Sequence, residues 1–189
     1  MSTGNHRFTV DEFRQFQTLE GNEDRRFELI NGVIIEKDII THEQAAIVGS
    51  MVYFLSKHLE AHGGGQVYVK SDFVPPPRIH HITTPLIPDV GMMINRGKAM
   101  ITADTPPSLP TIAIEVKARA NMIIHMRRKA EFYINNGTRL VWLIIPEYPL
   151  VEVYRPGEDV ILLKKDDSLT GYDVLPGFTL PIKELLEDE

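Results

Sequence analysis

The sequence predicts an α/β domain whose core runs helix, three strands, helix, strand, with one β-hairpin before the core and another after it. Three observations carry this prediction. A long amphipathic stretch and a shorter one separate runs of β-branched and aliphatic residues. One run, 140–145, is continuously apolar, as expected of a strand buried on both faces. Two further pairs of strand-like runs each flank a turn signal.

The N-terminal third contains a short helix, a hairpin and a long helix. The motif TVDE at 9–12 matches a capping box, and phenylalanines follow at helical spacing, which predicts a helix over about 10–19. In RRFELINGVIIEK, Asn31-Gly32 stands between two β-rich runs, and both turn positions favour positive φ, so a hairpin is expected. A second capping box, THEQ at 41–44, begins the long helix, which ends at the three glycines 63–65.

The central and C-terminal parts supply the sheet. Strands are expected over 67–74, 87–94 and 111–118, and a helix over about 121–136. After the apolar strand, VEVYR-PGED-VILLKK predicts a second hairpin, and a short helix begins near Pro181. Trp142 is expected in the core rather than exposed as a base-stacking platform. No repeat or linker interrupts the chain, so we expect a single domain over 1–189.

Composition restricts the class of protein. The 189 residues are 43% hydrophobic and 24% charged, near the globular average, which excludes disorder throughout. No apolar run reaches the roughly 20 residues that cross a bilayer, and the first residues carry no signal pattern, so we expect no membrane partner and a cytoplasmic location. There is no cysteine, which excludes thiolate chemistry. The net charge of −6 counts against a protein that simply coats nucleic acid, but less against an enzyme that contacts phosphate through a bound cation.

The strand TIAIEVKA carries an acid and a base. Because side chains alternate with a period of two, Glu115 and Lys117 are expected on one face and the isoleucines on the other. An isolated E-x-K is more often a solvated ion pair on a half-exposed strand. However, Pro88-Asp89 opens the preceding strand, so Asp89 and Glu115 meet if the two strands are neighbours.

Two adjacent carboxylates repel each other and stay ionised most easily around a hard cation such as Mg²⁺. A lysine beside them can stabilise charge on a phosphate or orient the attacking water. Acids that hold a metal and a lysine that contacts the phosphate or the water are together suited to phosphodiester hydrolysis.

In this order, Asp89, Glu115 and Lys117 resemble the motif of the PD-(D/E)XK nuclease superfamily. The chain is also similar to the putative restriction endonuclease (Uma-two-type) family of small bacterial proteins. The similar stretches, spread over about residues 26–186, are RFELINGVIIE, THEQAAIVG, LIPDVGMMI, IAIEVKA, RRKAEFYINNGTRLVWLI, VEVYR and LPGFTLPI. The resemblance implies a restriction-endonuclease-like fold and a Mg²⁺-dependent endonuclease acting on DNA, with Mn²⁺ as an alternative metal. Asp89 and Glu115 would hold the metal, and Lys117 would assist the nucleophile.

The resemblance also implies supporting residues. Glu28 is either a fourth site residue or an exposed acid on the hairpin strand. Gln44 resembles a helix-borne polar residue found near such sites, but the capping box explains it fully, and we favour the cap. Lys129, one turn before Tyr133, either faces the phosphate or extends its ammonium group to solvent from a partly buried helix.

Arg127 and Arg128, together with Lys129, form the one dense basic cluster, which suits contacts to the DNA backbone and equally suits a solvated helix face. A cut in both strands usually requires two sites, so a homodimer is expected. Two other interpretations remain open: a non-catalytic nucleic-acid-binding module, and a structural or interaction protein in which E-x-K is only a surface ion pair.

Overall fold

The computed structural model describes residues 6–37, 40–94, 108–119 and 121–186. The helices are α1 (Val10–Gln17), α2 (His42–His62), α3 (Ile123–Asn135), α4 (Ile182–Leu185) and a 3-10 turn, η1 (Pro77–Ile79). The strands are β1 (Arg26–Ile30), β2 (Val33–Lys37), β3 (Gly65–Val69), β4 (Val90–Ile94), β5 (Ile112–Val116), β6 (Leu140–Ile145), β7 (Leu150–Tyr154), β8 (Ile161–Leu163), β9 (Ser168–Thr170) and β10 (Thr179–Pro181). None of the helices in these ranges is long and apolar enough to cross a membrane.

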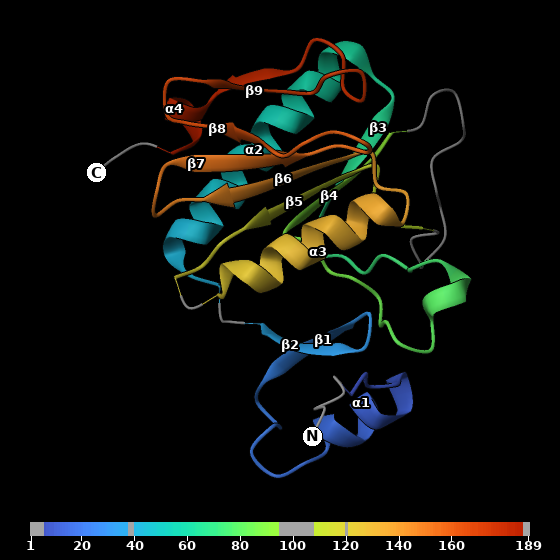
Figure 1. The fold of residues 1–189 in the computed structure, drawn as a ribbon. Helices are drawn as coiled ribbons and strands as arrows, with labels where there is room; N and C mark the ends of the chain where they lie inside the picture. The colour runs from blue at the N-terminus through green and yellow to red at the C-terminus, as the bar shows by residue number, and fades with distance from the viewer. Residues whose placement is uncertain (1–5, 38–39, 95–107, 120, 187–189) are drawn as a thin grey trace.

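A six-stranded mixed sheet in the order β3-β4-β5-β6-β7-β8 forms the centre of the fold. β5 and β6 are parallel, as a connection through α3 requires, and the other neighbours are antiparallel. The long helix α2 covers one face of this sheet, and α3 covers the other (Figure 1). The β1–β2 hairpin and α1 lie on the α3 side. The predicted order of helix, three strands, helix and strand is therefore confirmed as α2, β3–β5, α3 and β6.

Two apolar clusters, one on each face, fill the spaces between the sheet and the helices. The cluster under α2 contains Ile112, Ile114 and Val116, whereas Ala113 belongs to the cluster under α3. The alternation predicted for this strand is thus present in β5. It places Glu115 on the same face as Ala113, toward α3.

The hairpins agree with the sequence predictions in part. Asn31 and Gly32 form the β1–β2 turn with φ values of 50° and 77°, the left-handed conformation that motivated the prediction. The C-terminal hairpin β7–β8 extends the main sheet. A further small hairpin, β9–β10, was not predicted, because its two strands have three residues each and little periodicity.

The strand predicted over 111–118 was too long, since β5 ends at Val116. The Lys117 backbone N–H still donates to Ile144 O at 2.8 Å, but the chain then turns, and the Ala118 N–H donates to the side chain of Asn121 at 3.1 Å. The period of two therefore does not extend to Lys117.

Candidate functional site

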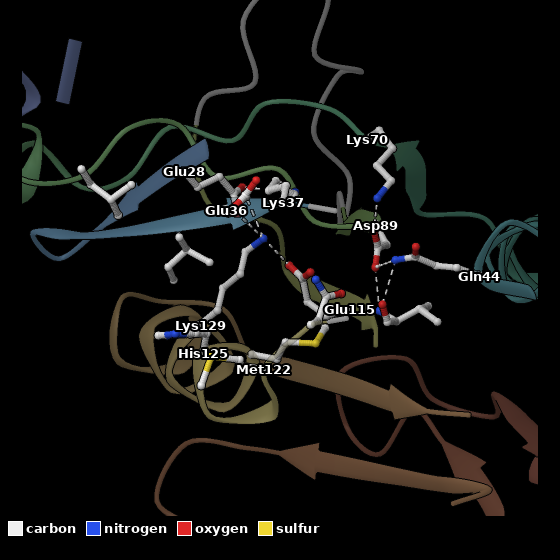
Figure 2. Close-up of a pocket in the computed structure, with 15 residues that line it drawn as sticks. Glu28, Glu36, Lys37, Gln44, Lys70, Asp89, Glu115, Met122, His125 and Lys129 are labelled. Atoms are coloured by element: carbon white, nitrogen blue, oxygen red, sulfur yellow. Dashed lines mark hydrogen bonds and ion pairs between the residues drawn. The ribbon is translucent and has the colours of Figure 1, made fainter. Parts of the chain in front are cut away.

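A cavity of about 260 Å³ lies where the end of β5 meets α3, the start of α2 and the β1–β2 hairpin (Figure 2). Four of the described residues that line it are acidic. Glu36 on β2 is exposed and pairs with Arg25, whereas the other three are buried: Glu28 from β1, Asp89 from the residue before β4, and Glu115 from β5. They are only 3%, 3% and 4% exposed. Carboxylates this buried require neutralising partners.

Neighbouring strands bring Asp89 and Glu115 to the same cavity. β4 and β5 pair antiparallel, as the sequence analysis expected, so the residue before β4 lies beside the end of β5. Asp89 Oδ2 accepts a hydrogen bond of 2.6 Å from the Val116 N–H, next in the chain to Glu115. The two acids are therefore placed by the sheet itself.

Lys129 enters the cavity from α3 and lies between two of the acids. Its Nζ is 2.8 Å from Glu115 Oε1 and 2.9 Å from Glu28 Oε2, and the lysine is 5% exposed. The Tyr133 hydroxyl, one helical turn further along, donates to Glu115 Oε1 at 3.2 Å. Of the two alternatives weighed for Lys129, a solvent-directed ammonium group is therefore wrong. Glu28 is not an exposed strand acid either.

Two lysines that the sequence analysis missed complete the neutralisation. Lys70 forms an ion pair with Asp89, and its backbone N–H donates to Asp89 O at 3.2 Å. Lys37, at the end of β2, has its Nζ 3.5 Å from Glu28 Oε1 and donates to Ile87 O at 2.8 Å. One signal for Lys70 was available, because an antiparallel partner of the Asp89 strand must supply a residue opposite Asp89.

The pKa values follow from this arrangement. Burial raises the pKa of Glu115, and although Lys129 acts against this, the charge of Asp89 adds to it. Burial would lower the pKa of Lys129, but the charges of Glu115 and Glu28 outweigh it and hold the pKa above its ordinary value. Burial would raise the pKa of Glu28, and here Lys129 and Lys37 outweigh it, so that pKa is lowered. Glu115 is consequently the acid of this pair that most readily takes up a proton.

Lys37 differs from Lys129. Burial lowers its pKa, and the positive charge of Lys129 lowers it further, while Glu28 only partly compensates. Three lysines therefore supply positive charge to the acids, in the place where a metal cation is expected to relieve their repulsion. A cation that enters the cavity therefore competes with ammonium groups already in place.

Gln44 lies in this site, and the preference for a purely capping role was wrong. Its backbone N–H does donate to Thr41 Oγ at 3.1 Å, as a cap requires. Its side-chain Nε2, however, donates to Val116 O at 2.8 Å and to Asp89 Oδ2 at 3.4 Å. The amide thus connects the N-terminus of α2 to both Asp89 and Val116, which are also hydrogen-bonded to each other.

Lys117 is not among the residues that line the cavity. Its Nζ lies 3.0 Å from Glu147 Oε1, beyond the end of β6, and donates to Ala118 O at 3.1 Å. The expectation that Lys117 stands beside Glu115 on one strand face was wrong, because β5 ends one residue before it.

The three side chains of the predicted basic cluster on α3 point to three different parts of the structure. The Arg127 Nε donates to both carboxylate oxygens of Glu152 on β7, at 3.1 Å each. The Arg127 charge therefore holds α3 to the sheet. Arg128 is exposed and lines a different groove, while Lys129 enters the acidic cavity.

The donor set of the cavity fits a hard cation. Carboxylate and carbonyl oxygens are the ligands that Mg²⁺ takes from proteins, usually one or two carboxylates with several retained waters. Asp89, Glu115 and Val116 O provide this set. Within the described ranges, no group of three or more histidine, aspartate or glutamate side chains is arranged to hold a metal. A site here would consist of two carboxylates and one carbonyl oxygen, completed by water.

Comparison with known proteins gives a family and a fold. The model of the Uma2 family, described as putative restriction endonuclease, matches residues 10–183. The fold is similar to that of a putative nuclease belonging to DUF820 from Anabaena variabilis ATCC 29413, with a TM-score of 0.75 and 20% sequence identity over 95% of this chain and 97% of the other. No curated protein matches the sequence significantly.

Proposed function

The chain belongs to the Uma2 family of putative restriction endonucleases, and we propose that it is a divalent-metal-dependent endonuclease that hydrolyses DNA phosphodiester bonds. One observation carries this proposal beyond family membership. Two carboxylates from adjacent strands, Asp89 and Glu115, reach one cavity together with ammonium groups that can contact a phosphate.

In this proposal Asp89, Glu115 and the Val116 carbonyl oxygen hold Mg²⁺ or Mn²⁺. The bound metal would polarise the phosphate and lower the pKa of a coordinated water. Gln44 orients the site, since its amide is hydrogen-bonded to both Val116 O and Asp89.

We assign the phosphate-facing ammonium group to Lys129 rather than to Lys117. Lys129 Nζ is 2.8 Å from Glu115, whereas Lys117 is bound to Glu147 outside the cavity. Lys129, held between Glu115 and Glu28, would be placed to donate to a non-bridging phosphate oxygen if a bound cation took over the charge of Glu115. Lys129→Gln should therefore abolish cleavage, and Lys117→Gln should retain most of it. The opposite ranking would refute this assignment.

The metal is tested by thermal unfolding in Mn²⁺ or Mg²⁺. A ligand at 100 times its Kd stabilises the native state by about 2.7 kcal/mol, which raises Tm by roughly 5–10 °C in a chain of this size. Asp89→Asn should remove this shift. Unchanged melting of the unsubstituted protein at saturating metal would refute the metal site.

The reaction is tested with supercoiled plasmid DNA and purified protein in the same buffers. We expect nicked or linear products that require Mn²⁺ or Mg²⁺ and disappear with Asp89→Asn. Metal binding without cleavage would contradict the nuclease proposal and favour a non-catalytic nucleic-acid-binding module.

We also expect a homodimer, because one site cuts one strand and a symmetric pair cuts two. Light scattering of the purified protein, with and without DNA, measures this. A monomer that still linearises plasmid in one encounter would contradict it.

A further inference from the structure

A second groove adjoins the acidic cavity and shares four lining residues with it: Ile34, Ile35, His125 and Lys129. Its walls come from the segment before α1, the β1–β2 hairpin, η1 and α3. In Figure 1 the β1–β2 hairpin lies on the α3 side of the fold. Residues from both of these elements line the groove. A chain that leaves the cavity in this direction passes along the groove.

Three arginines line this groove: Arg7, Arg78 and Arg128. All three are exposed, and in the described parts of the chain none of them forms an ion pair. Glu131 is the one acid among the described lining residues. The groove therefore carries uncompensated positive charge.

Asparagine side chains hold two of these guanidinium groups. Arg7 Nη1 donates to Asn31 Oδ1 at 3.1 Å, and Arg78 Nη2 donates to Asn136 Oδ1 at 2.7 Å. A neutral amide oxygen restricts the position of a guanidinium without cancelling its charge. The other donors of each guanidinium stay available for the forked contact that arginine makes with phosphate.

The molecule as a whole is acidic, with a net charge of −6. Five of the other described arginines form ion pairs with acids, namely Arg14, Arg25, Arg127, Arg139 and Arg155, whereas no ion pair is found for Arg26 or Arg119. Three of the five described arginines without an ion pair therefore line this one groove, next to the acidic cavity.

His125 provides an independent indication of a ligand. It lies on the wall that the groove shares with the cavity, and its Nδ1 atom is buried without a hydrogen-bond partner. A buried polar atom without a partner is unfavourable unless a ligand or water satisfies it. A group that bridges groove and cavity lies within reach of this atom.

We infer that the groove lined by Arg7, Arg78 and Arg128 binds the sugar-phosphate backbone of nucleic acid on one side of the phosphate that enters the acidic cavity. This inference rests on the proposed nuclease function, which supplies the nucleic acid. The three arginines position the strand, and none of them acts on the reacting atoms.

The test measures binding separately from cleavage. Fluorescence anisotropy with a labelled 20-base-pair DNA duplex is recorded for Asp89→Asn protein with Ca²⁺, at roughly 50–200 mM salt. Each phosphate contact contributes about −0.9 to the slope of log K against log salt. We expect the magnitude of this slope to fall by about 0.9 in each of the single variants Arg7→Gln, Arg78→Gln and Arg128→Gln. In the triple variant it should fall by about 2.7.

Arg139→Gln is the matched control. Arg139 is exposed and ion-paired with Asp173, and it is not among the residues that line the groove. The salt slope of the Arg139→Gln variant should therefore equal that of the Asp89→Asn parent protein. Circular dichroism of each variant verifies the fold. The single variants replace exposed side chains, so they keep the inference testable even if the triple variant unfolds.

The outcomes separate the two proposals. Reduced slopes, together with no plasmid cleavage by the unsubstituted protein in Mn²⁺ or Mg²⁺, would support the groove and refute the nuclease. A cleaving enzyme whose slope is unchanged by the arginine substitutions, or changed equally by Arg139→Gln, would refute the groove alone. Salt-independent binding, or no measurable binding, would also overturn the groove.

Discussion

Replacement of Lys129 by methionine is the most direct test of the charge network in the cavity. The substitution removes the ammonium group and keeps most of the apolar stem. It takes the nearest cation from Glu115 and leaves Glu28 with Lys37 only, at 3.5 Å. Both carboxylates stay buried, so water cannot replace the lost ion pairs.

The loss of unfolding free energy caused by Lys129→Met has an upper limit, because Glu115 can take up a proton when its charge is no longer neutralised. At pH 7, protonating a carboxyl whose ordinary pKa is 4.5 costs about 1.36 kcal/mol per pH unit, or about 3.4 kcal/mol. This lies within the roughly 3–5 kcal/mol found when one partner of a buried ion pair is removed. At pH 5.5 the same step costs only about 1.4 kcal/mol.

The sign of the pH dependence follows from proton uptake. Without Lys129, the pKa of Glu115 in the folded protein rises further above its unfolded value, so folding takes up a proton between the two values. Stability that depends on this proton is present at low pH and is lost as pH rises. The difference in unfolding free energy between wild type and Lys129→Met should therefore widen from pH 5.5 to pH 7.

Urea unfolding followed by Trp142 fluorescence at these two pH values measures the difference. Lys117→Met is the matched control, because Lys117 is similarly buried but its partner Glu147 is 27% exposed and can be solvated. We expect a loss of about 1 kcal/mol there, with little dependence on pH. Equal and pH-independent losses for the two variants would refute the neutralising role of Lys129.

Three further predictions concern other parts of the structure. Trp142→Ala should lower the unfolding free energy by about 3–5 kcal/mol in urea titrations, because the indole is fully buried. Arg127→Gln should cost about 2–3 kcal/mol by the same measurement, since it leaves the buried Glu152 carboxylate unpaired while the arginine side chain itself is 46% exposed. Lys70→Gln should tighten Mn²⁺ binding about fivefold in calorimetric titration, or about 1 kcal/mol, because it removes a positive charge from Asp89. Weaker Mn²⁺ binding by that variant would contradict a metal site at Asp89.

Predictions from the sequence were most accurate for features that depend on a single pattern of neighbouring residues. Alternation along β5 and the turn at Asn31-Gly32 each depend on residues close together in the chain, and both predictions are confirmed. The order of the core elements also followed from local patterns. The adjacency of β4 and β5, which brings Asp89 and Glu115 to one cavity, needed only one further step.

Predictions failed where a side chain's partner lies far away in the chain. The N-cap residue Thr41 accounts for the backbone N–H of Gln44, but the partners of its side chain are Asp89 and Val116, 45 and 72 residues away. Lys37 became recognisable only when the packing of the hairpin was known, and the signal for Lys70 required knowledge of which strand pairs with β4. Patterns of neighbouring residues carry little information about side-chain contacts between distant parts of the chain.

The run Arg127-Arg128-Lys129 shows how a chemical similarity in sequence can hide three separate functions. Successive residues in an α-helix point about 100° apart, so three basic neighbours cannot share one face. One side chain faces β7 and pairs with Glu152, the next lines the arginine groove, and the third reaches Glu115. The prediction of one basic cluster did not take this geometry into account, which favours three different environments. Only the fold could determine that one of them is structural, one faces the candidate backbone-binding groove, and one neutralises the acids of the candidate metal site.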